Sequence, residues 1–254
     1  MKLIAFFALA AIALARPPVD PEMQDILTDL IEEIDDHLTQ PVMLKFLQKT
    51  TDTKVSAGDR LVLRCEATST PNAVFQWFFN GKHIQGDKHL NVMEKLINAG
   101  KKTVESGIVF SQIVIPCASA ANAGLYKCVA FNGYDKIESQ AEVVVEGENA
   151  QCKPTHRVAP TITQWTDSRF EAEGNTATLT CRSSSATKHT TAWQNEDGAM
   201  INTQGGKFEV QDNGDLLIHN INWNDMGTYS CIASNKYGES RIESFLYPSK
   251  RATL

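Results

Sequence analysis

The sequence lacks the short motifs that mark most enzyme families. Its 254 residues contain no glycine-rich phosphate loop, no nucleophile elbow and no kinase signature. The six histidines are scattered along the chain, and no two of them have the helical spacing of a zinc site. We therefore expect a protein without enzymatic activity, without a cofactor and without a metal site.

Long hydrophobic runs are also missing, except for one short run at the start. Residues 3–14 are apolar but too few to span a bilayer, and Ala13 and Ala15 form a small-x-small cleavage pattern. This arrangement predicts a signal peptide at residues 1–15 and a mature chain that starts near Arg16. The end of the chain has no hydrophobic segment of the kind that directs a lipid anchor. We expect a secreted, extracellular protein without a membrane span.

An excess of basic side chains is absent from the main part of the chain. Residues 41–254 hold 22 acidic and 22 basic side chains. A nucleic-acid-binding protein usually shows a basic patch or stripe, so we expect no nucleic-acid partner. Residues 16–40 carry eight acidic side chains and one basic side chain, and with Lys2 they account for the formal net charge of −6.

This acidic segment also carries a regular apolar stripe. Its apolar side chains recur at steps of three and four residues: Met23, Ile26, Leu27, Leu30, Ile31, Ile34 and Leu38. The spacing predicts an amphipathic helix of about four turns between Pro21 and Pro41. Two interpretations stay open, since the helix can dock on one of the chain's own domains or anchor a partner. Its acidic face argues against binding to anionic membranes.

Cysteine is frequent, and four of the six cysteines belong to two copies of one pattern. In the first copy Trp77 lies twelve residues after Cys65, and Tyr126 lies two residues before Cys128. The same positions of the second copy hold Cys181, Trp193, Tyr229 and Cys231.

In an immunoglobulin sandwich the two cysteines join strands B and F, the Trp packs on their bridge, and the Tyr forms a corner before strand F. We therefore predict an all-β protein with two tandem immunoglobulin-like sandwiches of the I-set type, after a signal peptide and a short acidic amphipathic helix. The predicted buried disulfides are Cys65–Cys128 and Cys181–Cys231.

The pattern also predicts the boundaries of the parts. We expect a signal peptide at 1–15, an acidic leader at 16–40, a first domain at 41–147, a linker at 148–156, a second domain at 157–248 and a tail at 249–254.

The first domain is longer in its middle than the second. The interval from Trp77 to Cys128 is 51 residues, whereas the interval from Trp193 to Cys231 is 38. The extra residues are expected between positions 86 and 106, either as added strands of a variable-type domain or as an excursion with a helical turn.

A charged pair is expected at the tyrosine corner of the second domain only. Asp225 precedes Tyr229 there, and its carboxylate is in a position to meet Lys207 at the start of the strand D run. Asn122 occupies the equivalent place in the first domain, so this ion pair is absent there.

The remaining two cysteines, Cys117 and Cys152, are expected to form a third disulfide. Cys117 follows the end of strand E of the first domain, and Cys152 comes just after strand G, so both points fall at the same end of the sandwich. The bridge would close a loop of about 35 residues and contribute about 2–4 kcal/mol. It would also tie the linker to the base of the first domain. An oxidising compartment argues against a metal or redox role for this pair.

Several short segments resemble those of one family, the nematode secreted two-immunoglobulin-domain (zwei-Ig) proteins. They are Ile115-Pro116-Cys117-Ala118-Ser119, Val144-Val145-Glu146-Gly147-Glu148, Ser168-Arg169-Phe170-Glu171, Asp225-Met226-Gly227 and Phe245-Leu246-Tyr247-Pro248. The resemblance covers nearly the whole mature chain. It implies a secreted protein that helps to maintain the position of axons and cell bodies in the nerve cord, and it offers no catalytic residues.

The expected activity is therefore binding, with a cell-surface or extracellular-matrix protein as the partner. A more distant resemblance to secreted insulin-binding proteins of insects implies an alternative, in which the chain sequesters an insulin-like peptide hormone.

Overall fold

The computed structural model describes residues 40–86, 90–147, 152 and 157–250. The predicted signal peptide, nearly all of the acidic leader, most of the predicted linker and the last four residues lie outside the described residues. The chain from Leu38 onward forms a single compact unit that contains both sandwiches. No helix in the described part is long and apolar enough to cross a membrane.

The first sandwich contains eight strands, one short α-helix and one 3-10 turn. Their bounds are β1 (Met43–Gln48), β2 (Thr53–Ser56), β3 (Leu61–Thr70), β4 (Val74–Phe79), β5 (Lys82–Gly86), α3 (Val92–Ile97), β6 (Ser106–Ile115), η1 (Ala120–Asn122), β7 (Gly124–Phe131) and β8 (Lys136–Glu146).

The second sandwich is also built from eight strands, with one 3-10 turn in the described part. The bounds are β9 (Thr161–Ala172), β10 (Ala177–Leu179), β11 (Cys181–Ser184), β12 (Thr190–Gln194), β13 (Phe208–Val210), β14 (Leu216–Ile218), η3 (Trp223–Asp225), β15 (Gly227–Asn235) and β16 (Gly238–Ser249). The prediction of an all-β protein with two immunoglobulin sandwiches is confirmed.

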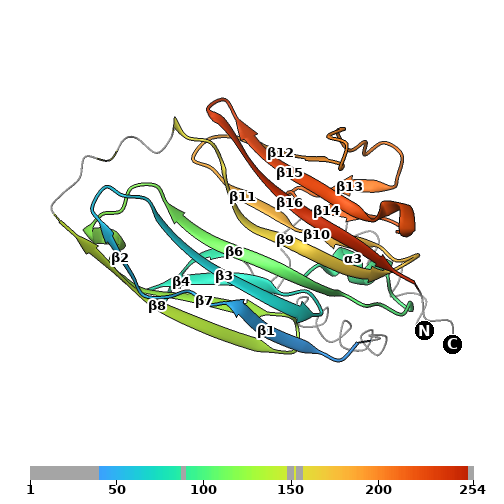
Figure 1. Cartoon of the computed structure of the whole chain (residues 1–254), viewed down its shortest axis with the longest axis horizontal. Coiled ribbons are helices and arrows are strands. Elements are labelled where there is room, and N and C mark those ends of the chain that lie inside the picture. The colour runs from blue at the N-terminus through green and yellow to red at the C-terminus, as the bar shows by residue number, and fades with distance from the viewer. Residues whose placement is uncertain (1–39, 87–89, 148–151, 153–156, 251–254) are drawn as a thin grey trace, which may run out of the picture. The chain divides into compact units, whose positions relative to one another are not determined.

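The strands form three sheets, and one of them runs through both domains. The five-stranded sheet β2-β8-β7-β4-β5 belongs to the first domain, and the three-stranded sheet β10-β14-β13 belongs to the second. The third sheet has eight strands in the order β1-β3-β6-β9-β16-β15-β12, with β11 paired to β9. Figure 1 shows β6 and β9 side by side at the point where this shared sheet passes from one domain to the other.

Each sandwich has its own core around a disulfide and a tryptophan. Cys65–Cys128 joins β3 to β7, and Cys181–Cys231 joins β11 to β15. Trp77 and Trp193 are buried beside these bridges. Burial of an indole requires a partner for its N–H, and each one has a partner: Ser111 Oγ accepts from Trp77 and the carbonyl of Gly214 accepts from Trp193, both at 2.9 Å.

Both tyrosine corners are formed as the spacing predicts. The hydroxyl of Tyr126 donates to the carbonyl of Asn122 at 3.0 Å, and that of Tyr229 donates to the carbonyl of Asp225 at 2.9 Å. The predicted ion pair of the second domain is confirmed, since Lys207 Nζ lies 2.6 Å from Asp225 Oδ2.

The insertion in the first domain contains a helix and no added strand in its described residues. After β5 the chain forms α3 and then returns to β6 through a turn and a short irregular stretch. The helical one of the two predicted alternatives is therefore correct. The six residues of α3 are too few to form a stable helix alone, so this helix depends on the surface that it contacts.

Candidate recognition surface and interdomain contact

Strands β6 and β9 hold the two domains together by direct antiparallel pairing. The register runs from Ser106 opposite Phe170 to Ser111 opposite Gln164, with a bulge at Asp167. Side chains also cross this boundary, because the rings of Phe110 and Trp165 stack with centroids 5.1 Å apart. The domains are therefore joined by sheet pairing in addition to the linker.

Three consecutive residues of β9 point to two different faces of the sheet. Arg169 and Glu171 are fully buried, whereas Phe170 between them is exposed. Strand alternation explains this division, since neighbouring side chains point to opposite faces of a sheet. The charged residues point inward and the aromatic residue outward, which reverses the usual assignment of polar and apolar positions.

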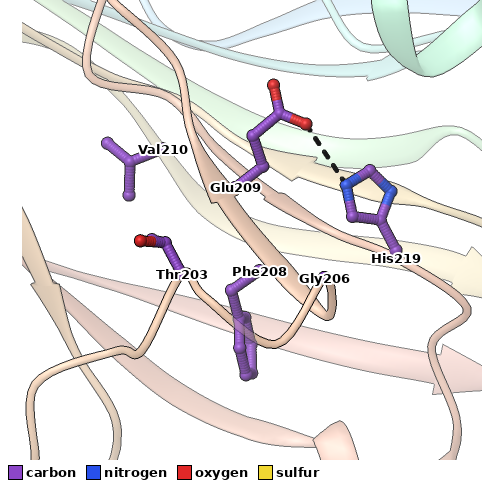
Figure 2. Close-up of a pocket in the computed structure, with 6 residues that line it drawn as sticks. All are labelled: Thr203, Gly206, Phe208, Glu209, Val210 and His219. Carbon is purple, nitrogen blue, oxygen red and sulfur yellow. Dashed lines mark ion pairs between the residues drawn. The ribbon is translucent and has the colours of Figure 1, made fainter.

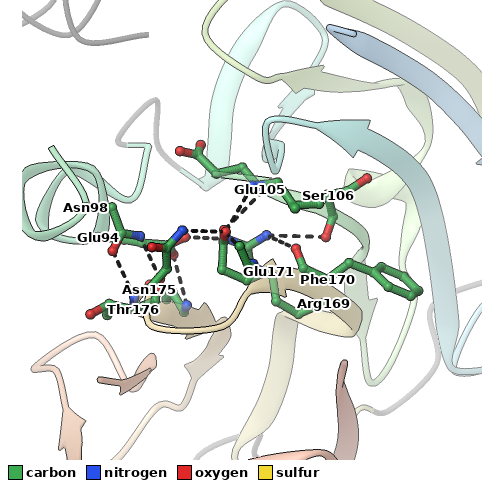
Figure 3. A network of polar contacts seen from close by, with 12 residues as sticks. Glu94, Asn98, Glu105, Ser106, Arg169, Phe170, Glu171, Asn175 and Thr176 are labelled. Atoms are coloured by element: carbon green, nitrogen blue, oxygen red, sulfur yellow. Dashed lines mark hydrogen bonds and ion pairs between the residues drawn. The ribbon is translucent and has the colours of Figure 1, made fainter. Parts of the chain in front are cut away.

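The guanidinium of Arg169 connects strand β9 to the helix of the other domain. Its Nη2 donates to Glu94 Oε1 on α3 and, at 2.9 Å, to Glu171 Oε2 on its own strand. Its Nη1 donates to the carbonyls of Phe170 at 2.8 Å and Ser106 at 3.3 Å. Figure 3 shows these side chains gathered between α3 and β9. A buried arginine requires such partners, because an unpaired buried charge costs several kcal/mol.

Helix α3 docks on the free edge of β10 through two side chains. Glu94 Oε2 accepts a hydrogen bond from the backbone N–H of Thr178 at 2.9 Å. Asn98 Oδ1 accepts from the N–H of Thr176 at 2.8 Å, and Asn98 Nδ2 donates to the carbonyl of Thr176 at 2.8 Å. These side chains satisfy strand-edge groups that a neighbouring strand would otherwise bind.

The carboxylate of Glu171 fixes the end of the insertion. It accepts from the backbone N–H groups of Val104 at 2.9 Å and Glu105 at 3.1 Å. The side chain of Asn175 donates to the same carboxylate at 3.0 Å and to the carbonyl of Lys102 at 2.8 Å. The insertion of the first domain therefore works as a clamp on the second domain.

Burial shifts the pKa values of the ionisable groups in this cluster. It raises the pKa of Glu94, although Arg169 opposes the rise. Burial and then the charge of Glu94 raise the pKa of Glu105 to about 7, against the opposing effects of Lys95 and Arg169. Burial disfavours the charged form of Arg169, but Glu94 and Glu171 outweigh it and raise the pKa of that group.

The outward face of the second domain carries four exposed aromatic side chains, which we call the aromatic strip. Phe170 on β9 lies opposite Tyr247 on β16, with ring centroids 5.7 Å apart. Trp223 on η3 meets the same Tyr247 edge-on at 5.8 Å, and Phe245 lies two positions earlier on β16. Their exposed fractions are 38% for Phe170, 36% for Tyr247, 45% for Trp223 and 38% for Phe245. A cluster of large exposed aromatic residues is typical of a binding surface.

The surface of the second domain also contains hollows. One hollow of about 490 Å³ is lined by Thr203, Gly206, Phe208, Glu209, Val210 and His219 (Figure 2). Its one marked interaction is an ion pair of 3.5 Å between His219 Nε2 and Glu209 Oε2. Within the described residues, no group of three or more His, Cys, Asp or Glu side chains is arranged to hold a metal ion.

The six cysteines form three disulfides. Two of these bridges are in the domain cores, and the third joins Cys117, just after β6, to the exposed Cys152. The sequence interpretation missed Arg169, Glu94, Glu171 and Asn98 as a group. From the sequence, the segment from Ser168 to Glu171 stands out only by its resemblance to the family, although an Arg and a Glu on alternate positions of one strand indicate a shared face.

Comparison with known proteins agrees with the fold at the level of each domain. The immunoglobulin I-set domain family matches residues 44–145, and an immunoglobulin domain family matches residues 159–235. A solved structure described as neural ectodermal development factor IMP-L2 superposes with a TM-score of 0.64 and 24% identity. The match covers 84% of this chain and 98% of that chain, and it supports the fold alone.

Full-length relatives come from Caenorhabditis elegans. The Zwei Ig domain protein zig-3 is 49% identical over 252 residues, which are 99% of this chain and 99% of the relative. Zwei Ig domain protein zig-4 is 47% identical over 93% of this chain and 92% of the relative. With two immunoglobulin domains and this identity along its length, the chain belongs to the zwei Ig family of extracellular immunoglobulin proteins.

Proposed function

We propose that the chain is a secreted, non-enzymatic recognition protein that binds a cell-surface or extracellular-matrix protein and thereby helps to maintain the position of axons and neurons in the nerve cord. The observation that carries the binding proposal is the aromatic strip. Membership of the zwei Ig family supports the extracellular setting, and the neuronal role extends to this chain what the sequence resemblance implies.

The composition of the strip suits a protein partner. Phe, Tyr and Trp dominate the binding energy of many protein interfaces, because each one buries a large area at a low cost in side-chain entropy. The strip is ordered before binding: β9 and β16 pair with Phe170 opposite Tyr247, and Glu173 Oε1 accepts from the backbone N–H of Trp223 at 2.7 Å. An ordered surface loses less entropy when its partner binds.

A second candidate function is the capture of an insulin-like peptide. The observation that favours it is the shared sheet, whose outward face continues from β3 and β6 of the first domain to β9 and β16 of the second. A small folded peptide on this face would contact both domains at once.

The test is a binding panel with matched variants. The purified secreted protein is applied to ectodomains of neuronal surface proteins, to matrix proteins and to insulin-like peptides. The double variant Phe170→Ser, Tyr247→Ser removes the centre of the strip. The control Leu125→Ser, Val144→Ser removes two exposed apolar side chains from the other sheet of the first domain. A variant that lacks residues 16–40 shows whether the acidic leader contributes to binding.

We expect a surface or matrix protein to bind, and the strip variant to lose at least tenfold in affinity while the control keeps it. Binding of a peptide hormone with no surface or matrix partner would replace the first proposal by the second. Equal losses in the strip variant and in the control would contradict the assignment of the strip.

A further inference from the structure

The clamp between the domains holds more carboxyl groups than positive charges. Glu94 and Lys95 come from α3, Glu105 from the stretch before β6, and Arg169 and Glu171 from β9, and all five are buried. With every group ionised the cluster would carry one excess negative charge. An unbalanced charge in a buried site is costly, and a bound proton removes it.

We propose that this cluster is a proton-operated latch, which holds α3 on the second domain firmly when one proton is bound to it and loosens the contact when that proton is lost. This inference concerns how the two domains are coupled and does not depend on which partner the protein binds.

Of the three carboxyl groups, we assign the proton to Glu105. The carboxylate of Glu171 accepts five hydrogen bonds, from Val104, Glu105, Ala172, Asn175 and Arg169. Glu94 accepts from Arg169 and Thr178. No hydrogen bond to the Glu105 carboxyl is found among the described residues, so this group can take up a proton without displacing a donor.

The other charged groups near the clamp are more exposed than these five. Lys101 Nζ donates to the carbonyl of Gly174 at 3.3 Å. On the side of the second domain, His219 Nδ1 lies 3.3 Å from Thr176 Oγ1, and its Nε2 faces Glu209. The backbone carbonyl of Lys102 accepts a hydrogen bond from the side chain of Asn175. The groups that contact the Arg169 guanidinium from both domains are therefore the two carboxylates and backbone carbonyls.

The direction of the pH effect follows from the raised pKa of Glu105. The folded domain pair binds this proton more tightly than the unfolded chain, whose carboxyl titrates at the ordinary value of 4.5. The stability from this group is therefore fully present below about pH 4.5 and is lost as the pH rises through about 7. The pKa of Glu94 is raised as well, so it acts in the same direction.

Glu105 lies on the stretch of backbone that connects α3 to β6. The N–H of Glu105 is bound to Glu171, and Glu105 itself has φ of 46°, in the left-handed region where a non-glycine residue is uncommon. A charge that develops on this side chain acts directly on the stretch that connects α3 to β6. The contacts that should loosen first are those of Thr176 and Thr178 with α3.

Amide hydrogen exchange of the full secreted protein between pH 5.5 and 8.5 tests the proposal. Protection factors are corrected for the pH dependence of intrinsic exchange. We expect the amides of Thr176 and Thr178 to lose about tenfold in protection at the higher pH, while the core amide of Ile232 on β15 does not change.

The isosteric variant Glu105→Gln mimics the protonated group and should keep high protection throughout. The control Glu142→Gln, at an exposed position of β8, should behave as the wild type. Protection that does not depend on pH in the wild type would overturn the proposal, as would an unchanged pH dependence in a folded Glu105→Gln variant.

Discussion

Asn98, which follows the last turn of α3, pairs with the backbone of Thr176 as a strand would: it accepts from the N–H and donates to the carbonyl, each at 2.8 Å. The two residues belong to different immunoglobulin domains. A side-chain amide has one acceptor and one donor group in the same plane, which is why it can replace a peptide group at a strand edge.

Replacing Asn98 with Ala should therefore weaken the clamp. Both Thr176 groups would lose their partners in a buried place, and each unsatisfied buried group costs about 1–3 kcal/mol. We expect urea unfolding to show a loss of about 2 kcal/mol. The variant Asn202→Ala, at an exposed position where the side chain accepts one local hydrogen bond, should change stability by less than about 0.5 kcal/mol. Equal effects of the two variants would contradict the role given to Asn98.

Removal of the positive charge at Arg169 should lower the stability of the protein more than the Asn98→Ala substitution does. In Arg169→Met the buried carboxylates of Glu94 and Glu171 lose their common partner, and breaking a buried ion pair costs about 3–5 kcal/mol. Calorimetry and denaturant unfolding measure the loss.

The double variant Arg169→Met, Glu94→Gln should recover part of this stability, since it also removes one of the stranded charges. Arg241→Met, whose side chain donates to Gln194 on the exposed face, is the matched control. A double variant as unstable as the sum of the single variants would count against the proposed charge coupling.

The three disulfides give a chemical prediction. Peptide mapping without reduction should find Cys65–Cys128, Cys181–Cys231 and Cys117–Cys152, with no free thiol. The double variant Cys117→Ser, Cys152→Ser should fold with both core bridges intact and lose about 2–4 kcal/mol, as the closed loop of 35 residues suggests. A free thiol at Cys117 or Cys152, or a bridge from either one to a core cysteine, would disprove the third pair.

The phenol of Tyr229, at the tyrosine corner of the second domain, should ionise at a higher pH than an ordinary tyrosine. Burial, and then the charge of Asp225, raise the pKa of Tyr229 to about 12. The stability from this group is therefore present below the ordinary value of 10 and is lost as the pH rises through about 12. Absorbance at the phenolate band should show one tyrosine that ionises after the others.

The hydroxyl of Tyr229 can be removed with little change of shape. Tyr229→Phe should lose the late ionisation and about 1 kcal/mol of stability, because its hydrogen bond to Asp225 is removed. Tyr237→Phe, at an exposed position, is the control. Persistence of the late ionisation in Tyr229→Phe would show that another tyrosine is responsible.

Sequence spacing is sufficient to predict the two sandwiches, because the two cysteines, the tryptophan and the tyrosine of each copy occupy fixed positions on the strands of an immunoglobulin fold. The Lys207–Asp225 pair could be predicted for the same reason. The length of the insertion also follows from the sequence. Its conformation does not, since α3 is short and acquires its stability from contacts with the second domain.

The interdomain contact could not be predicted in this way. Pairing between β6 and β9 joins residues that are about 60 positions apart in the chain, and neither strand carries a local signal for its partner. Arg169 and Glu171 also look like solvent-facing positions of an edge strand, with Phe170 as the buried one. The structure reverses this assignment, because the insertion of the first domain covers the charged side of β9 and leaves the aromatic side open.

The shared sheet also has a mechanical consequence. Hydrogen bonds between antiparallel strands lie across the strand direction, so a pull along β6 and β9 in opposite senses shears several bonds at the same time. A pull across the strands opens the same bonds one after another. If one attachment point lies on each domain, the tension that the domain pair withstands therefore depends on the direction of the load.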